Sequence, residues 1–179
     1  MICFIRKRPA LQIGRHQVID YDTSWLGDAL RRAAQAAERE DFPFVDDIRS
    51  GIETYLESRC PLQLLPIDEL YGRMKRMLEK IGCEGIAEKL QPLAPPVTVS
   101  LQQAAAEVGS GFEIGFFSRL DADLRELRAA GVERIAAVGL RDCVLALCGS
   151  TDWDSGCDRL CSELSEFLGL RGVEIAREG

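Results

Sequence analysis

The residues best suited to metal or nucleophilic chemistry are one histidine and four cysteines near the C-terminal end of the sequence. Cys143 and Cys148 form a C-x4-C pair and Cys157 and Cys161 a C-x3-C pair, spacings that just satisfy the pattern of zinc sites. We expect the first pair to diverge, because residues five apart on a predicted strand point to opposite faces. The second pair shares one face of a predicted helix with leucines, as core cysteines do. His16 has no recognisable partner, so the sequence predicts neither a metal site nor a disulfide.

Two further patterns could carry chemistry, but neither predicts a catalytic centre. Residues 109–115, GSGFEIG, are superficially like a phosphate loop, but their last glycine is one place late and the preceding segment is predicted to be helical. Asp121 and Asp123 are two residues apart on a predicted helix, so they do not share a face for acid–base work. We expect the phenylalanines of this region to lie in a core or cover an interface: Phe112, Phe116 and Phe117.

The composition is that of an ordinary globular protein. The 179 residues are 46% hydrophobic and 28% charged, which excludes a disordered or fibrous chain. With 29 carboxylates against 22 Lys and Arg, the net charge of -7 favours neither nucleic acid nor anionic membranes as partners. We expect no membrane span, no signal peptide and a cytoplasmic location, where an odd number of cysteines, seven, stays reduced.

Hydrophobic periodicity divides the first half into a hairpin and four helices. The helices are predicted at residues 24–39, 43–60, 67–81 and 84–90, from apolar residues that recur at steps of three and four. Residues 3–6 and 17–21 are predicted to be the strands of the hairpin, with residues 7–16 as its long connection.

Three prolines in Gln91-Pro92-Leu93-Ala94-Pro95-Pro96 predict a domain boundary, because proline interrupts helices and strand pairing. Residues 1–90 would form one domain, 91–96 a linker and 97–179 a second domain. In the second we expect a strand at 97–101, helices at 102–108 and 117–131, a strand hairpin at 132–138 and 142–147, a helix at 153–168 capped by Thr151, and an edge strand at 173–175. We detect no internal repeat. The predicted fold class is α+β, a β-hairpin plus helical bundle followed by a small α/β sandwich.

The first half resembles the ATP-cone, a nucleotide-sensing module of ribonucleotide reductases and of the bacterial repressor of reductase genes. The family's V-x-K-R-D-G strand is similar to residues 5–10, IRKRPA, and its F-D-x-x-K-[IL] motif to residues 21–26, YDTSWL. Its Pro-Ser/Thr-x-E-[IL] motif is similar to residues 66–70, PIDEL. The closing A-x-x-Y survives only as Ala87. The resemblance covers residues 3–90.

This sequence departs from the ATP-cone pattern at three places. Pro9-Ala10 replaces the Asp-Gly turn, the hairpin is about six residues longer, and Trp25 stands where the family has a lysine. Losing that lysine weakens the case for phosphate binding, which needs several converging cations.

The resemblance implies a regulatory, non-catalytic protein that binds ATP or dATP through Lys7 and Arg8, which match the family's phosphate-contacting pair. The alternative is a protein-interaction scaffold that has lost nucleotide binding, in which Arg6, Lys7, Arg8 and Arg15 are solvated charges on a hairpin edge. A third hypothesis is a small enzyme with a site between the two halves. The expected partners are a nucleotide, another protein or a second copy of the chain.

Overall fold

The computed structural model describes residues 8–177, which form two compact units. The N-terminal unit runs to Pro95 and includes Ala129–Glu133; the C-terminal unit comprises Pro96–Arg128 and the chain from Arg134 onward. The described residues contain eight helices and two three-stranded sheets, which confirms the predicted α+β class. None of the helices in the described part of the chain is long and apolar enough to cross a bilayer.

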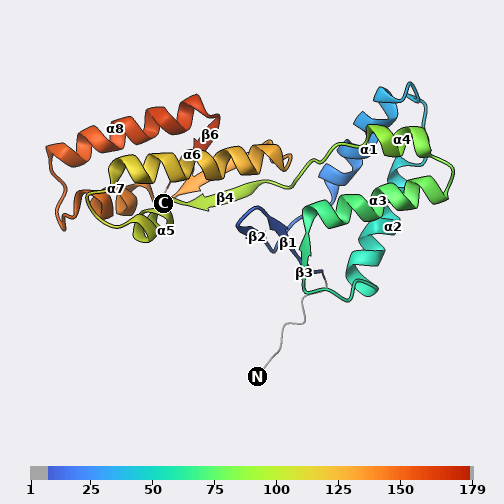
Figure 1. Ribbon diagram of the computed structural model, residues 1–179, viewed down its shortest axis with the longest axis horizontal. Coiled ribbons are helices and arrows are strands. Elements are labelled where there is room, and N and C mark those ends of the chain that lie inside the picture. Colours follow the sequence, from blue (N-terminus) through green and yellow to red (C-terminus); the bar gives the residue numbers. More distant parts are fainter. Residues whose placement is uncertain (1–7, 178–179) are drawn as a thin grey trace. The chain divides into compact units, whose positions relative to one another are not determined.

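The sheet of the N-terminal unit has the order β2-β1-β3 (Figure 1). β1 (Ala10–Ile13) and β2 (His16–Val18) are antiparallel, and β1 pairs in parallel with β3 (Leu64–Pro66). Leu11 and Ile13 of β1 are fully buried, which fits the alternation of a strand with one face on a core. Gly14 takes a positive φ of 57° in the two-residue turn to β2, a conformation that glycine adopts without steric cost.

The predicted hairpin was wrong in its position. Residues 7–16, expected to be a connection, contain the whole of β1 and the turn, while residues 3–6 lie outside the described part of the chain. The hairpin is therefore short, and Pro9-Ala10 is not its turn. His16, expected in a loop, is the first residue of β2 and lies opposite Ile13.

Four helices follow, close to their predicted bounds: α1 (Ser24–Ala36), α2 (Val45–Ser58), α3 (Ile67–Lys80) and α4 (Glu84–Lys89). α1 packs against α2 and α4, and α4 packs against α3. The buried residues recur at helical spacing, as Leu70, Met74 and Leu78 do in α3. The proline-rich segment is tied to this bundle, because the Tyr71 hydroxyl donates to the carbonyl of Leu93 at 2.6 Å and accepts from its N–H at 2.8 Å.

The C-terminal unit repeats a strand followed by two helices. Its elements are β4 (Val97–Ser100), α5 (Leu101–Val108), α6 (Glu113–Ala129), β5 (Ile135–Val138), α7 (Leu140–Cys148), α8 (Ser155–Leu170) and β6 (Val173–Ile175). The strands are parallel in the order β4-β5-β6, and Val97 pairs with Ile135 as Ile135 pairs with Val173, an offset of 38 residues each time. A structural repeat is thus present where none was detected in the sequence.

Helix α7 corrects the predicted strand at residues 142–147. Its buried residues Cys143, Val144 and Leu147 are spaced as on a helix face, and Gly139 begins it with a positive φ of 76°. Cys143 and Cys148 therefore lie on a helix, where the alternating faces of a strand do not apply to them. Helix α8 is capped by Asp154, whose Oδ1 accepts from the N–H of Cys157 at 2.9 Å, and not by Thr151 as predicted.

Candidate functional site

A hollow of about 760 Å³ opens in the N-terminal unit where the chain before β1, the start of α1 and one face of α2 meet. Its lining is polar apart from Ile19, and it contains two arginines, four carboxylates and two aliphatic hydroxyls: Arg8, Ile19, Asp20, Tyr21, Asp22, Thr23, Ser24, Arg49, Glu53 and Glu57. Only Arg8 among these was singled out in the sequence as a binding residue.

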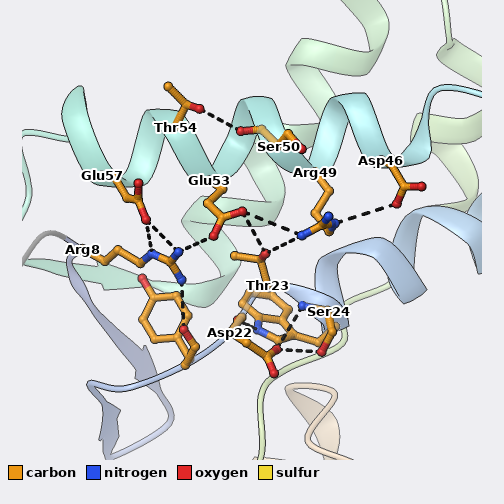
Figure 2. Close-up of polar contacts among 12 residues, drawn as sticks. Arg8, Asp22, Thr23, Ser24, Asp46, Arg49, Ser50, Glu53, Thr54 and Glu57 are labelled. Atoms are coloured by element: carbon orange, nitrogen blue, oxygen red, sulfur yellow. Dashed lines mark hydrogen bonds and ion pairs between the residues drawn. The ribbon is translucent and has the colours of Figure 1, made fainter.

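Arg8 is held by two carboxylates of α2. Its Nε and Nη2 donate to Oε1 of Glu57 at 2.9 and 2.7 Å, and Nη2 also donates to Glu53 (Figure 2). Nη1 donates to the main-chain carbonyl of Tyr21 at 3.0 Å. Burial by itself would lower the pKa of Arg8, but the bonds and charges of Glu57 and Glu53 together raise it above its ordinary value. All three guanidinium nitrogens are thus engaged by this chain's own acceptors.

Tyr21 links the same segment to the hairpin. Its side chain is buried, and its hydroxyl donates to the carbonyl of Pro9 at 2.8 Å. Burial raises the pKa of this phenol to about 12, opposed by the nearby positive charge of Arg8 and assisted by Cys60. Tyr21 therefore stays protonated at physiological pH and acts as a donor.

A second arginine continues the contacts along α2. Nη1 of Arg49 donates to the hydroxyl of buried Thr23 at 3.1 Å and lies 3.7 Å from Oε2 of Glu53. On its other side, Nε of Arg49 lies 3.9 Å from Asp46. Negative and positive charges consequently alternate across the face of α2, in the order Glu57, Arg8, Glu53, Arg49 and Asp46 (Figure 2). We call these five residues, with Tyr21 and Thr23, the Arg8 network.

The charges of the hollow do not suit a free phosphate. Two arginines face four lining carboxylates, Asp20, Asp22, Glu53 and Glu57, so a phosphate entering here would have to displace Glu53 and Glu57 from Arg8 and would meet like charge. The ion pairs that line the hollow can instead hold the segment before β1 against α2, because they join residues 45 and 49 positions apart in the sequence.

The residues singled out by the ATP-cone resemblance are Lys7, Arg8 and Trp25. Lys7 lies outside the described residues, so only Arg8 can be placed. Trp25, which replaces a lysine of the family, is buried, donates from Nε1 to the carbonyl of Asp22 at 2.7 Å, and has the rings of Tyr21 and Tyr71 at 6.4 and 6.5 Å. It is an apolar anchor for the start of α1.

The partners of Arg8 were not predicted from the sequence. A signal existed: Arg49, Glu53 and Glu57 are spaced by four residues, which places them on one side of α2, with Asp46 three residues before Arg49. Such spacing shows that charges share a face, but it does not show which distant segment they meet.

The cysteines form no metal site in the part of the chain described: no group of three or more His, Cys, Asp and Glu residues is arranged to hold an ion there. Cys143 and Cys157 are buried core residues, and burial raises the pKa of the Cys143 thiol to about 12. Burial, with Cys157, Asp154 and Glu113 adding to it, raises the pKa of Cys148 to about 11, so this thiol is a weak nucleophile. The expected core or interface group is divided: Phe116 is buried and Phe117 packs on Phe167, whereas Phe112 is 64% exposed.

Comparison with known proteins found no match to this chain among protein-family models, curated proteins or solved structures.

Proposed function

We propose that this protein is a non-catalytic regulatory protein that acts by binding another protein, with a cone-like N-terminal scaffold that does not use Arg8 to bind nucleotide phosphates. The observation that carries the proposal is the engagement of all three guanidinium nitrogens of Arg8 by Glu57, Glu53 and the carbonyl of Tyr21. A charge-assisted pair on the same chain competes with any phosphate at no cost in translational entropy.

The scaffold part of the proposal draws on the ATP-cone resemblance. That resemblance implies a hairpin followed by four helices, and β1, β2 and α1–α4 follow one another in that order. The cytoplasm is the compartment we propose, on the basis of the odd number of cysteines.

Nucleotide sensing is the second candidate, and the size of the hollow favours it. A volume of about 760 Å³ lies within the range of small-molecule sites, and two arginines and two hydroxyls line it. ATP or dATP would then bind by exchanging carboxylate partners of Arg8 for phosphate oxygens.

Thermal unfolding with ATP, dATP, ADP and cyclic nucleotides tests the two candidates. A ligand present at 100 times its Kd stabilises the native state by about 2.7 kcal/mol, enough to move the melting temperature by several degrees. We expect no shift for the wild-type chain. A shift that is lost in Arg8→Ala and retained in Arg125→Ala, an exposed arginine of the C-terminal unit, would show that nucleotide sensing is the function.

A further inference from the structure

Helices α2 and α3 leave an apolar groove on the open side of the N-terminal bundle. α1 contacts α2 and α4, and α4 contacts α3, but α2 and α3 pack less closely with each other than these pairs do. Between them is a hollow of about 300 Å³. We call it the α2/α3 groove, and its lining comes from both helices: Ile52, Tyr55, Leu70, Arg73, Met74 and Met77.

The groove continues into apolar residues along both helices. Ile81 follows Met77 by four residues, which places it on the same face of α3, and 55% of its surface is exposed. On α2, half-buried Ile48 precedes Ile52 by four residues. The apolar surface is therefore longer than the hollow itself, as a surface that receives a helix must be.

Both methionines other than Met1 line the groove. Met74 is buried at its base, and Met77 is half-buried at its side. Methionine is unbranched and polarizable, so a surface built from it adapts its shape to an incoming apolar side chain.

The α3 side of the groove carries two cations, Arg73 and Lys80, although the chain as a whole has a net charge of -7. Arg73 lies over the Tyr55 ring at 5.9 Å and is tied to Glu69 and the Tyr55 hydroxyl. Lys80 follows Arg73 by two helical turns on the same side of α3, is exposed, and makes no ion pair with a described residue.

We propose that the α2/α3 groove binds an acidic amphipathic helix of a partner protein. An apolar side chain of that helix would enter the hollow between Tyr55 and Met74. Its carboxylates would face Lys80, because Arg73 is already paired with Glu69. This inference rests on the proposed protein-binding function and names the chemistry of the partner. A helix fits because a third helix in the furrow between two others buries a continuous apolar stripe.

Methionine methyl NMR on the full chain tests the proposal. With ¹³C-labelled methionine methyls only Met1, Met74 and Met77 give signals, so two of three report on the groove. The probe is a synthetic helical peptide with leucines at i, i+3 and i+7 and glutamates beside them; a matched peptide carries lysines instead of glutamates. We expect the acidic peptide to shift the signals of Met74 and Met77, and to bind at least tenfold more tightly than the basic peptide.

Charge reversal provides a matched pair of variants. Lys80 and Lys89 are each the last residue of their helix, α3 and α4, and both are exposed. Lys80→Glu should weaken binding of the acidic peptide about fivefold, the effect of one surface charge pair, whereas Lys89→Glu should leave it unchanged. Met77→Glu places a carboxylate at the side of the groove and should abolish binding; its circular dichroism shows whether the chain stays folded.

Three results would overturn the proposal: unshifted Met74 and Met77 signals, equal binding of both peptides, or equal effects of the two lysine variants. Signals that move with protein concentration alone would identify a second copy as the occupant instead. Nucleotide binding through Arg8 would refute the proposed function but leave the NMR result unaffected, so the two failures can be told apart.

Discussion

The two units secure their sheets against their helices by different means. In the N-terminal unit the mixed sheet also buries aliphatic residues, Leu11, Ile13 and Leu65, but polar contacts beside its strands add to this packing. Arg8 is bonded to α2, and Tyr21 is bonded to the carbonyl of Pro9. In the C-terminal unit three parallel strands repeat at an offset of 38 residues, and their buried residues are aliphatic: Val97, Val99, Ile135, Ala137 and Val173.

This difference indicates where each unit tolerates change. Apolar packing is non-directional, so a repeated strand–helix–helix unit can keep its core through many conservative substitutions. An ion-pair network depends on a few specific donors and acceptors, and losing one leaves the others unsatisfied. The two tryptophans allow the units to be followed separately, because Trp25 lies in the N-terminal unit and Trp153 in the C-terminal unit.

The strongest test compares the same tripeptide in the two units. Gly131-Val132-Glu133 belongs to the N-terminal unit and Gly172-Val173-Glu174 to the C-terminal unit, and both glycines have positive φ, 92° and 64°. A Cβ on Gly131 would lie 2.2 Å from the carbonyl oxygen of Pro92, whereas one on Gly172 would meet only the Arg128 guanidinium at 3.4 Å. Gly131→Ala should lower the free energy of unfolding by about 3–5 kcal/mol and Gly172→Ala by about 1–2 kcal/mol. Urea unfolding measures both, and equal losses would contradict the close contact.

An alkaline titration tests the burial of the Tyr21 phenol beside the N-terminal hairpin. The pKa of Tyr21 is about 12 in the folded protein, against about 10 for an unfolded tyrosine. The folded state therefore keeps a proton that the unfolded state loses, so this contribution is complete below pH 10 and is lost as the pH rises to about 12. This difference in pKa corresponds to about 3 kcal/mol at most. In Tyr21→Phe, the free energy of unfolding should fall less between pH 10 and pH 12. Urea unfolding monitored by Trp25 fluorescence measures it, and an unchanged pH dependence would show that Tyr21 does not titrate as inferred.

Helix capping also differs between α5 and α1. Ser100 caps α5 by accepting a hydrogen bond from the N–H of Gln103 at 3.2 Å, whereas the hydroxyl of Thr23, at the start of α1, makes no cap bond and accepts from Arg49. Ser100→Ala should cost about 1 kcal/mol, reported by Trp153. Ser100→Thr, which keeps a capping hydroxyl, is the control and should restore most of the loss.

The smallest effect is expected for a single pair of the Arg8 network. Arg8 and Glu57 are 21% and 38% exposed, so solvent screens their attraction. A double-mutant cycle with Arg8→Met and Glu57→Gln should give a coupling energy of about 0.5–1 kcal/mol that falls in high salt. The Arg125–Asp121 pair of α6, whose arginine is 79% exposed, is the reference, and its coupling should be smaller. A coupling energy of zero between Arg8 and Glu57 would show that the Arg8 network does not attach the hairpin to α2.

Local patterns were sufficient for most helices. The bounds of α2, α3 and α4 follow from apolar residues at steps of three and four and from nearby Pro and Gly, because helical hydrogen bonds and side-chain faces are set within a few residues. The short apolar run in α7 was ambiguous for the opposite reason: four to eight apolar residues fit a buried strand as well as a helix, and only packing against α5 and α8 distinguishes them.

The sequence by itself determined the composition, the net negative charge and the spacing of apolar residues within the helices. It also placed Arg8 in a short segment with other cations. Tertiary structure decided the rest. β3 is three residues long and exists as a strand because it pairs with β1, more than fifty residues earlier in the chain, and the 38-residue offset is a property of a ladder between distant segments. Arg8 acquired its partners in the same way, since Glu53 and Glu57 lie 45 and 49 residues away. Contacts at such separations depend on how the elements pack, which no local spacing encodes.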